Sequence, residues 1–299
     1  MGRYHSHINS ALKLLQLYKG EMPFSTFIKQ FFSKEKKYGS KDRKQIAALC
    51  YSYFRVGLVF KKQLSEENLL KTFFLVNDEP SLLIQELKPE WNESISKPIE
   101  EKIKLLNELI NIHDIFSLTT ELNDTIDVEL FYKSFLLQPS LFVRIRPQNK
   151  NAVIEKIKAA AVEHLFLNDC NSVQFSPGIR IEKLLVADKE IVIQDYNSQQ
   201  VLNYIKENNS HFEEKEIAVW DCCAASGGKS ILIYDLLNGK INLTVSDIRQ
   251  SIIANLQQRF KNAGIKGYHH FIADISDETK KNPALKYDII ICEIGRAHV

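Results

Sequence analysis

The sequence lacks the features that mark disulfide-stabilised, metal-binding or membrane-spanning proteins. Its 299 residues include five cysteines, with no C-x-x-C pair and no histidines spaced as partner ligands, which argues against a disulfide framework and a zinc site. No apolar run approaches the ~20 residues that a membrane-spanning helix needs. The N-terminus has no signal-peptide core, because His5, His7, Asn9 and Lys13 interrupt it. The sequence therefore predicts a reduced, cytoplasmic chain without a metal site or membrane contact.

Residues 1–137 have little strand-period alternation. Their apolar residues recur at helical spacing, so an all-α domain is predicted for this segment. We expect one helix on the face of Ala11, Leu14, Leu15 and Tyr18, one between a Ser40 cap and Gly57, and others over Leu69–Val76 and Ile99–Ile110.

Residues 138–190 change in character and predict a small α+β module. Apolar and polar residues alternate over Ser140–Arg146, as in a half-buried strand. A helix is expected over Val153–Val162, and two further strands over Leu165–Leu167 and Ile179–Leu185.

Residues 191–292 predict an α/β domain with a parallel sheet. Near-continuous apolar runs alternate with helical patterns, as expected when helices cover both faces of a sheet. The expected helices are Ser198–Asn208, Lys229–Leu237 and Ser251–Ala263, and the expected strands are Ile217–Trp220, Ile241–Ser246, Tyr268–Ala273 and Tyr287–Cys292.

The stretch D-C-C-A-A-S-G-G-K-S, residues 221–230, almost spells a phosphate-binding loop. The Walker pattern requires a glycine at position 223, which is cysteine here, so a triphosphate site is the weaker reading. As the first strand-to-helix turn of a doubly wound sheet, the stretch would let a ligand approach at Gly227 and Gly228. The following helix N-terminus would offer backbone donors to that ligand.

Two acids complete the predicted site. Asp247 ends the next strand, roughly 20 residues beyond the glycines, where a carboxylate accepts hydrogen bonds from ribose hydroxyls. Asp274 ends the third strand, where it could accept the exocyclic amine of an adenine. Either acid alone could equally be a helix N-cap. Together with the glycine turn they favour a cofactor that contains adenosine.

These motifs resemble those of a known family. The stretch at 221–230 resembles the D-x-C-A-A-P-G-G-K-[ST] motif of the Nop/Sun family of RNA cytosine-5 methyltransferases, with Ser226 in place of the proline. Val192–Gln199 resembles the V-Q-D-x-x-S-Q segment of that family, and Pro139–Arg146 resembles its strand preceding the catalytic domain. Gly39–Arg55 is similar to a helix of the NusB-like domains found in RsmB-type ribosomal RNA methyltransferases.

The resemblance implies a Rossmann-like S-adenosylmethionine-dependent methyltransferase domain at 191–292, preceded by an all-α NusB-like RNA-binding domain at 1–137 and the α+β module at 138–190. It implies a monomer that methylates cytosine C5 in RNA, with small-subunit ribosomal RNA as the substrate. The cofactor would be S-adenosyl-L-methionine, with Asp247 at its ribose, Asp274 at its adenine, and its remainder wrapped by Cys223, Ala224, Ala225, Ser226, Gly227, Gly228 and Lys229.

The nucleophile of that chemistry is missing from the sequence. The resemblance implies a catalytic cysteine in a Thr-Cys motif and a second in Asp-x-Pro-Cys, but neither a Thr-Cys nor a Pro-Cys dipeptide occurs. A nucleophilic role for Cys222 or Cys223 is disfavoured, because a turn wrapped round a cofactor leaves little room for a base. Cys50, Cys170 and Cys292 are interpreted as small core residues.

After Cys292 the sequence reads E-I-G-R-A-H-V, which matches one reading frame of a common sequencing adapter. We therefore expect residues 293–299 to be a non-native tail on a truncated chain, with the catalytic cysteines beyond the break. Such a chain would be inactive. The alternative is a NusB-like RNA-binding factor whose methyltransferase domain is degenerate and non-catalytic.

Local charge has to identify any RNA contact, because 39 basic and 37 acidic residues leave a net charge of only +2. A solvated surface and a phosphate-contacting patch are about equally good interpretations of one basic cluster, comprising Lys34, Lys36, Lys37, Lys41, Arg43 and Lys44. Arg144 and Arg146 are the better candidates for RNA contact. They face the same side of their predicted strand by its period of two.

Overall fold

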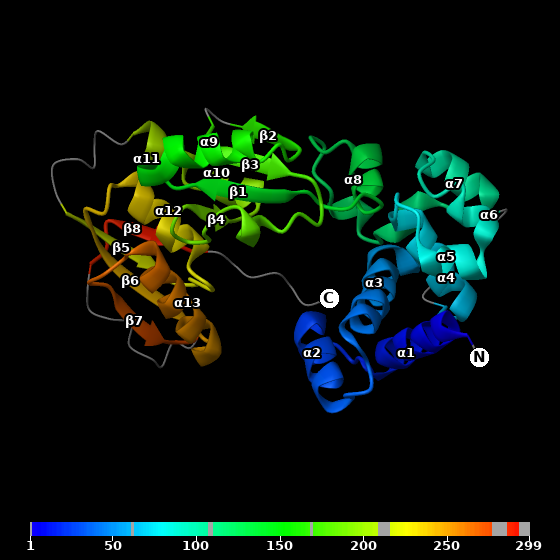
Figure 1. Cartoon of the computed structure of the whole chain (residues 1–299). Coiled ribbons are helices and arrows are strands. Elements are labelled where there is room, and N and C mark those ends of the chain that lie inside the picture. Colours follow the sequence, from blue (N-terminus) through cyan, green and yellow to red (C-terminus); the bar gives the residue numbers. More distant parts are fainter. Residues whose placement is uncertain are drawn as a thin grey trace. The chain divides into compact units, whose positions relative to one another are not determined.

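The computed structural model describes residues 2–60, 63–106, 110–167, 170–208, 216–276 and 286–292. The chain divides between Gln138 and Pro139 into two compact units, one residue beyond the predicted end of the helical segment (Figure 1). The predicted tail, residues 293–299, lies outside the described residues. None of the described helices combines the length and apolarity needed to cross a membrane.

The described part of the first unit is helical. The predicted apolar face of the first helix is partly confirmed, since Ala11 and Leu14 are fully buried. Residues Leu69–Val76 are buried on all sides, so the helix that carries them forms the centre of the core. The helices are α1 (Arg3–Leu17), α2 (Phe24–Lys34), α3 (Ser40–Val56), α4 (Glu66–Val76), α5 (Leu82–Leu87), α6 (Pro89–Asn92), α7 (Ile99–Leu105) and α8 (Val128–Ser134), with 3-10 turns at Gly57–Phe60, Ile112–Ile115 and Thr119–Glu121.

The start of α3 is fixed by Asp42 rather than by Ser40, so the predicted cap is wrong. The Gly39 N–H donates to Asp42 Oδ2 at 3.0 Å. Arg3 Nη2 and His7 Nε2 contact Asp42 Oδ1 at 2.7 and 3.0 Å, which ties α1 to the start of α3. Hydrogen bonds from Arg3 and from the Gly39 amide lower the pKa of Asp42 to about 2.

The predicted basic cluster spans the end of α2, the connecting loop and the first turns of α3, and all six of its side chains are exposed. Tyr38 lies buried beneath it and donates a hydrogen bond to Ser10 Oγ at 3.0 Å. Arg43 Nε donates to the Tyr38 carbonyl at 2.9 Å, and Glu35 lies 3.8 Å from Lys37. The cluster is thus anchored by an aromatic residue and only partly neutralised.

The second unit begins with an antiparallel sheet of order β2-β3-β1-β4. Its strands are β1 (Leu141–Ile145), β2 (His164–Leu167), β3 (Ser172–Phe175) and β4 (Ile191–Ile193). Helix α9 (Lys150–Ala159) packs on it through Val153 and Ile157.

One expectation for this module is wrong, and two of its strands were not predicted. Ile179–Leu185 is not a strand but contains the 3-10 turn Ile181–Lys183. Ile181 in the turn and Leu185 after it are buried in the core of this module. The sequence also missed β3 and β4. β4 starts at the first residue assigned to the catalytic domain and pairs with β1, Val143 lying opposite Ile193. Both strands are short and are defined by their pairing with β1.

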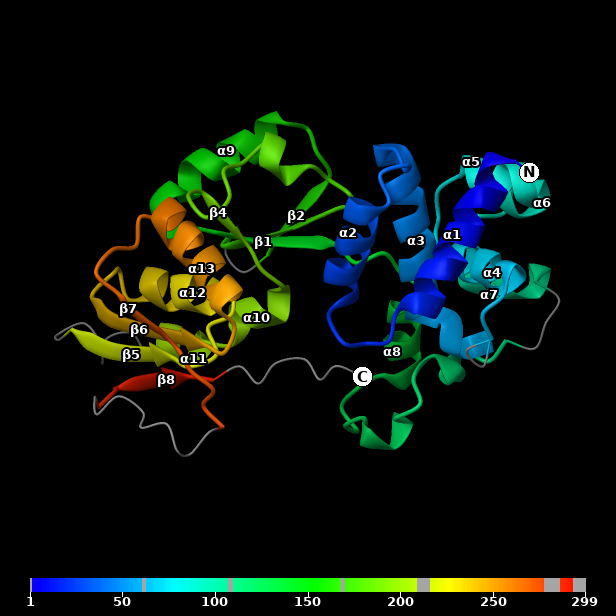
Figure 2. The same ribbon diagram turned by 90° about the horizontal axis from the view of Figure 1, so that it is seen from below.

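The second sheet confirms the predicted parallel α/β arrangement. Its order is β7-β6-β5-β8, from β5 (Ile217–Asp221), β6 (Ile241–Asp247), β7 (His269–Ile272) and β8 (Ile289–Ile291). Helices α12 (Gly228–Leu236) and α13 (Gln250–Ala263) cover one face (Figure 2). The predicted helix Ser198–Asn208 is two short helices, α10 (Tyr196–Gln200) and α11 (Asn203–Glu207).

β8 is an edge strand of the described sheet, not the fully buried strand predicted from its apolar run. Ile290 is 59% exposed and Cys292 is exposed. The strand order reverses between β5 and β8, since the chain moves outward to β6 and β7 before it returns. Ligands of open α/β sheets bind at such a switch point, beyond the carboxyl ends of the strands.

Candidate cofactor site at the carboxyl edge of the parallel sheet

The loop from β5 to α12 is held by buried polar contacts at its two ends. Ser230 Oγ donates to Asp221 Oδ2 at 2.6 Å, and both residues are almost fully buried. Between them the backbone turns through two residues of positive φ, Ala225 at 46° and Gly227 at 83°. This conformation aims the amino end of α12 at the switch point, as the sequence predicts.

Packing against α13 requires a glycine at position 227. A Cβ built on it would lie 2.7 Å from Phe260 Cε1 and 3.1 Å from Leu256 Cγ, both on α13. A Cβ on Gly228 would meet Gln194 Nε2 at 3.7 Å, an ordinary contact. Gly227 therefore allows α13 to pack against the loop, and Gly228 is the glycine with space toward the open side.

Asp247 ends β6 and holds the loop directly. Its Oδ2 accepts the Ala225 N–H at 3.1 Å, and Arg249 contacts both oxygens through its guanidinium. Burial opposes ionisation, but the hydrogen bonds from Arg249 outweigh it and hold the pKa of Asp247 below its ordinary value. The structure thus places this carboxylate beside the loop, where it is ionised at neutral pH.

Asp274 follows β7, one strand further along the edge. The backbone joins the two strand ends, since the Ala273 N–H donates to the Asp247 carbonyl at 3.3 Å. Asp274 Oδ1 accepts from the Ser276 N–H at 3.0 Å and from its hydroxyl at 2.7 Å. These two contacts with the residue two positions further on form a local turn.

A cavity of about 140 Å³ lies beside the loop. Six of the predicted cofactor residues line it, whereas Gly227, Asp247 and Asp274 do not. Five lining residues were not among the predicted cofactor residues, namely Ile193, Gln194, Ser198, Asp221 and Arg259. The first three lie in the segment that resembles V-Q-D-x-x-S-Q, and Asp221 opens the loop motif itself. The lining comprises Ile193, Gln194, Ser198, Asp221, Cys223, Ala224, Ala225, Ser226, Gly228, Lys229 and Arg259.

Arg259 of α13 binds the loop at Ser226, the residue that differs from proline in the motif that the loop resembles. Its Nη1 donates to the Ser226 carbonyl and to Ser226 Oγ, both at 2.9 Å. Its Nε and Nη2 donate to Asp188 Oδ1 at 2.9 and 2.7 Å. The serine hydroxyl thus supplies an acceptor that a proline could not.

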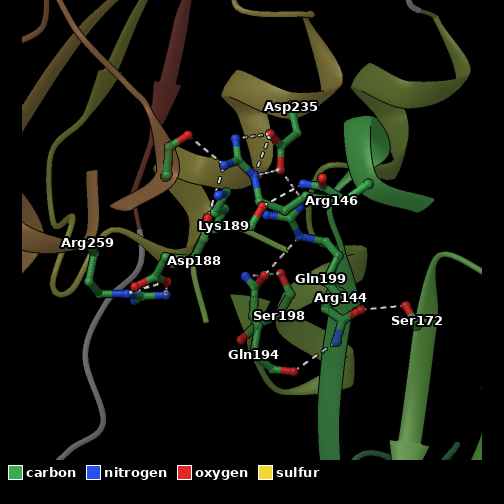
Figure 3. Close-up of polar contacts among 12 residues, drawn as sticks. Arg144, Arg146, Ser172, Asp188, Lys189, Gln194, Ser198, Gln199, Asp235 and Arg259 are labelled. Atoms are coloured by element: carbon green, nitrogen blue, oxygen red, sulfur yellow. Dashed lines mark hydrogen bonds and ion pairs between the residues drawn. The ribbon is translucent and has the colours of Figure 1, made fainter. Parts of the chain in front are cut away.

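Arg144 and Arg146 do not form an RNA-facing surface, so that prediction is wrong. Their side chains face the same side of β1, as expected, but they are buried and converge on Asp235 of α12 (Figure 3). Arg144 Nη1 lies 2.6 Å and Arg146 Nη2 2.7 Å from Asp235. Arg146 also donates to the Asp188 and Ala263 carbonyls. These arginines join the antiparallel sheet to the parallel one.

The cysteines near the loop are not activated. Burial raises the pKa of Cys222 to about 12 and also raises that of Cys223, so both are thiols at neutral pH. Cys50 is buried, as predicted. Cys170 is only partly buried and Cys292 is exposed, so the core interpretation of Cys292 is wrong. It fails because β8 lies at the sheet edge.

The chain is similar in fold to the solved structure of PH0851, a Pyrococcus protein. The TM-score is 0.55 at 16% identity, over 90% of this chain and 68% of that one. NSun6 from Pyrococcus horikoshii, determined with SFG, matches with a TM-score of 0.39 and 11% identity, over 52% of this chain and 63% of that one. A methyltransferase homolog protein from Pyrococcus horikoshii gives 0.39 and 11%, over 79% and 61%. No family model and no curated protein matches the chain.

Proposed function

We propose that the chain belongs to the S-adenosylmethionine-dependent RNA methyltransferases and that the β5–α12 loop is its cofactor cradle. The observation that carries the proposal is the loop itself. The D-C-C-A-A-S-G-G-K-S stretch closes a strand-to-helix turn at the switch point, its small residues line a cavity, and the acid of the next strand bonds to it. A triphosphate loop fits less well, because Cys223 stands where the Walker pattern needs glycine.

The residues of the site fit an adenosine cofactor. Asp247 keeps the hydrogen bonds from the Arg249 and Ala225 backbone N–H groups when the Arg249 side chain moves aside, so its carboxylate can then accept hydrogen bonds from ribose hydroxyls. Arg249 is free to do so, since its side chain is 56% exposed. Asp274, half-buried at the adjoining strand end, is the proposed acceptor for the adenine amine. Bound there, S-adenosyl-L-methionine supplies the methyl group.

The proposed reaction is methylation of cytosine C5 in RNA, with small-subunit ribosomal RNA as the substrate. This reaction requires a thiolate that adds to C6 of the base and makes C5 nucleophilic. Cys222 and Cys223 have raised pKa values and do not meet that requirement. Because the sequence also lacks Thr-Cys and Pro-Cys, we expect this 299-residue chain to bind the cofactor without transferring its methyl group.

A second candidate function is an RNA-binding factor with a NusB-like helical domain and a degenerate methyltransferase domain. One observation favours it, the exposed basic cluster at the end of α2 and the start of α3. Both candidates predict RNA binding that weakens with salt, as phosphate contacts do. They differ in catalysis, which a methyl-transfer assay measures directly.

Calorimetric titration with S-adenosyl-L-methionine tests the cofactor site. We expect Asp247→Asn to weaken binding by about 10- to 100-fold, because a charged hydrogen-bond acceptor is lost. Arg249→Ala is the matched control. It removes the partner that covers the carboxylate, so binding stays equal or tightens. Unchanged affinity in Asp247→Asn, with an unchanged thermal transition, would refute the site.

Transfer of a labelled methyl group to unmodified ribosomal RNA then separates the two functions. Cofactor binding without transfer is the outcome expected for the 299-residue chain. A chain that also carries a Thr-Cys and an Asp-x-Pro-Cys motif should transfer the methyl group to a cytosine C5 if the protein is an enzyme. A version that binds both cofactor and RNA yet transfers nothing favours the degenerate factor.

A further inference from the structure

Three cysteine side chains meet at the carboxyl edge of the parallel sheet. Cys222 and Cys223 follow β5, and Cys292 follows β8, the neighbouring strand across the switch point. Their Sγ atoms all lie within 4.8 Å of one another, and all three are free thiols. We propose that this group, the thiol cluster, binds a thiophilic divalent cation of the Zn²⁺ class through three protein ligands, leaving one position open.

The distances suit such an ion. Zn–S bonds of ~2.3 Å in a tetrahedral site put the sulfurs about 3.8 Å apart. The thiol cluster therefore has to contract by about 1 Å or less. Cys292 can make that adjustment, because it is exposed at the end of an edge strand. One cation displaces three thiol protons and leaves a complex with a net charge of −1.

The nature of the donors selects the ion. Thiolates favour zinc and softer cations over magnesium and calcium, which take oxygen ligands. Within the described residues, no histidine or carboxylate joins the three sulfurs. Three protein ligands with an open fourth position is the arrangement of zinc sites that take up an outside ligand, whereas structural zinc sites are closed by four.

The open position would lie between two hollows. Cys223 lines the cavity beside the loop. Cys292 lines a larger hollow of about 640 Å³ together with Ile291. Ser198 and Lys229 line both hollows. Because Cys223 is also in the proposed cradle, ion and S-adenosyl-L-methionine should compete. This competition rests on the proposed function, but the metal site itself does not.

Packing as small core residues is the ordinary explanation for clustered cysteines. It accounts for Cys222, which is buried, but not for Cys292, which is exposed. Nor is Cys292 brought to Cys222 and Cys223 by local sequence, since it follows β8 and they follow β5. A role as metal ligand explains why the exposed Cys292 lies beside Cys222 and Cys223.

The test is titration of the 299-residue chain with Cd²⁺, kept reduced by a phosphine. We expect thiolate-to-metal charge-transfer absorption that saturates at one ion per chain, and Zn²⁺ should suppress it. Cys292→Ser should weaken Cd²⁺ binding by at least about tenfold. Cys170→Ser is the control, because Cys170 is a free cysteine outside the thiol cluster.

Circular dichroism checks that Cys292→Ser remains folded, as expected for an exposed position. Absence of thiolate absorption in the wild-type chain would overturn the proposal. So would Cys292→Ser binding Cd²⁺ as tightly as the wild type. If Cd²⁺ binds but S-adenosyl-L-methionine binds neither with nor without it, the metal site stands and the proposed cofactor function fails.

Discussion

At the scale of single residues, Gly227 connects the loop with the helix behind it. It combines a φ of 83° with a Cβ position already occupied by Phe260. Any side chain there therefore strains the backbone and overpacks α13 at the same time. Its neighbour Gly228 has neither constraint, although the two glycines look equivalent in the sequence.

We therefore expect Gly227→Ala to lower the free energy of unfolding by about 2–4 kcal/mol, from left-handed backbone strain and overpacking together. Gly228→Ala should stay within about 0.5 kcal/mol of the wild type, because its Cβ finds space at the start of α12. Denaturant unfolding measures both. Equal effects of the two substitutions would contradict the packing role assigned to Gly227.

At the scale of elements, Asp42 joins α1 to the amino end of α3. Its pKa is lowered to about 2 from an ordinary value of 3.8. A lowered pKa means that ionised Asp42 stabilises the fold at pH values above about 4. This contribution is lost as the pH falls from about 4 through about 2, where the folded-state carboxylate becomes protonated.

Asp42→Asn should accordingly lower the thermal transition of the helical unit by a few degrees at pH 7, and the difference should shrink as the pH falls below about 4. Ser40→Ala is the control and should change little, because Ser40 is exposed and Asp42 makes the cap contact. Melting curves between pH 7 and 3 show the trend. A difference that persists unchanged at pH 3 would mean that ionisation of Asp42 is not its cause.

At the scale of the second unit as a whole, one buried carboxylate connects its two sheets. Asp235 of α12 accepts hydrogen bonds from Arg144 and Arg146 of the β1 segment, and all three side chains are buried. Burial lowers the pKa of Arg144 despite the neighbouring carboxylate. Removing the only carboxylate in this group would leave two buried cations without a counter-charge.

We expect Asp235→Asn to destabilise the second unit by about 3–5 kcal/mol, the usual cost of breaking a buried ion pair. Glu182→Gln, an exposed acid of the same unit, should have an effect within about 0.5 kcal/mol. Denaturant unfolding followed by tryptophan fluorescence reports on this unit through Trp220 when Trp91 of the first unit is replaced by phenylalanine in every variant. If Asp235→Asn matched Glu182→Gln, the ion pairs would not be what couples the two sheets.

The sequence alone determined the elements and motifs that local spacing encodes. The parallel strands, the helices α12 and α13, and the loop at 221–230 all follow from apolar runs, helical periodicity and glycine placement, which act over a few residues. The positions of Asp247 and Asp274 at strand ends follow from the same patterns. The short β3 and β4 strands were missed, because their pairing with β1, which no local pattern encodes, is what defines them.

Only the tertiary structure decided which distant residues meet. It buried Arg144 and Arg146 against Asp235, turning an expected RNA surface into an internal contact. It placed Arg259 on the loop and Cys292 beside Cys222 and Cys223. The physical reason is strand order: the amino-acid sequence shows that strands exist, whereas pairing across the sheet determines which strand ends become neighbours.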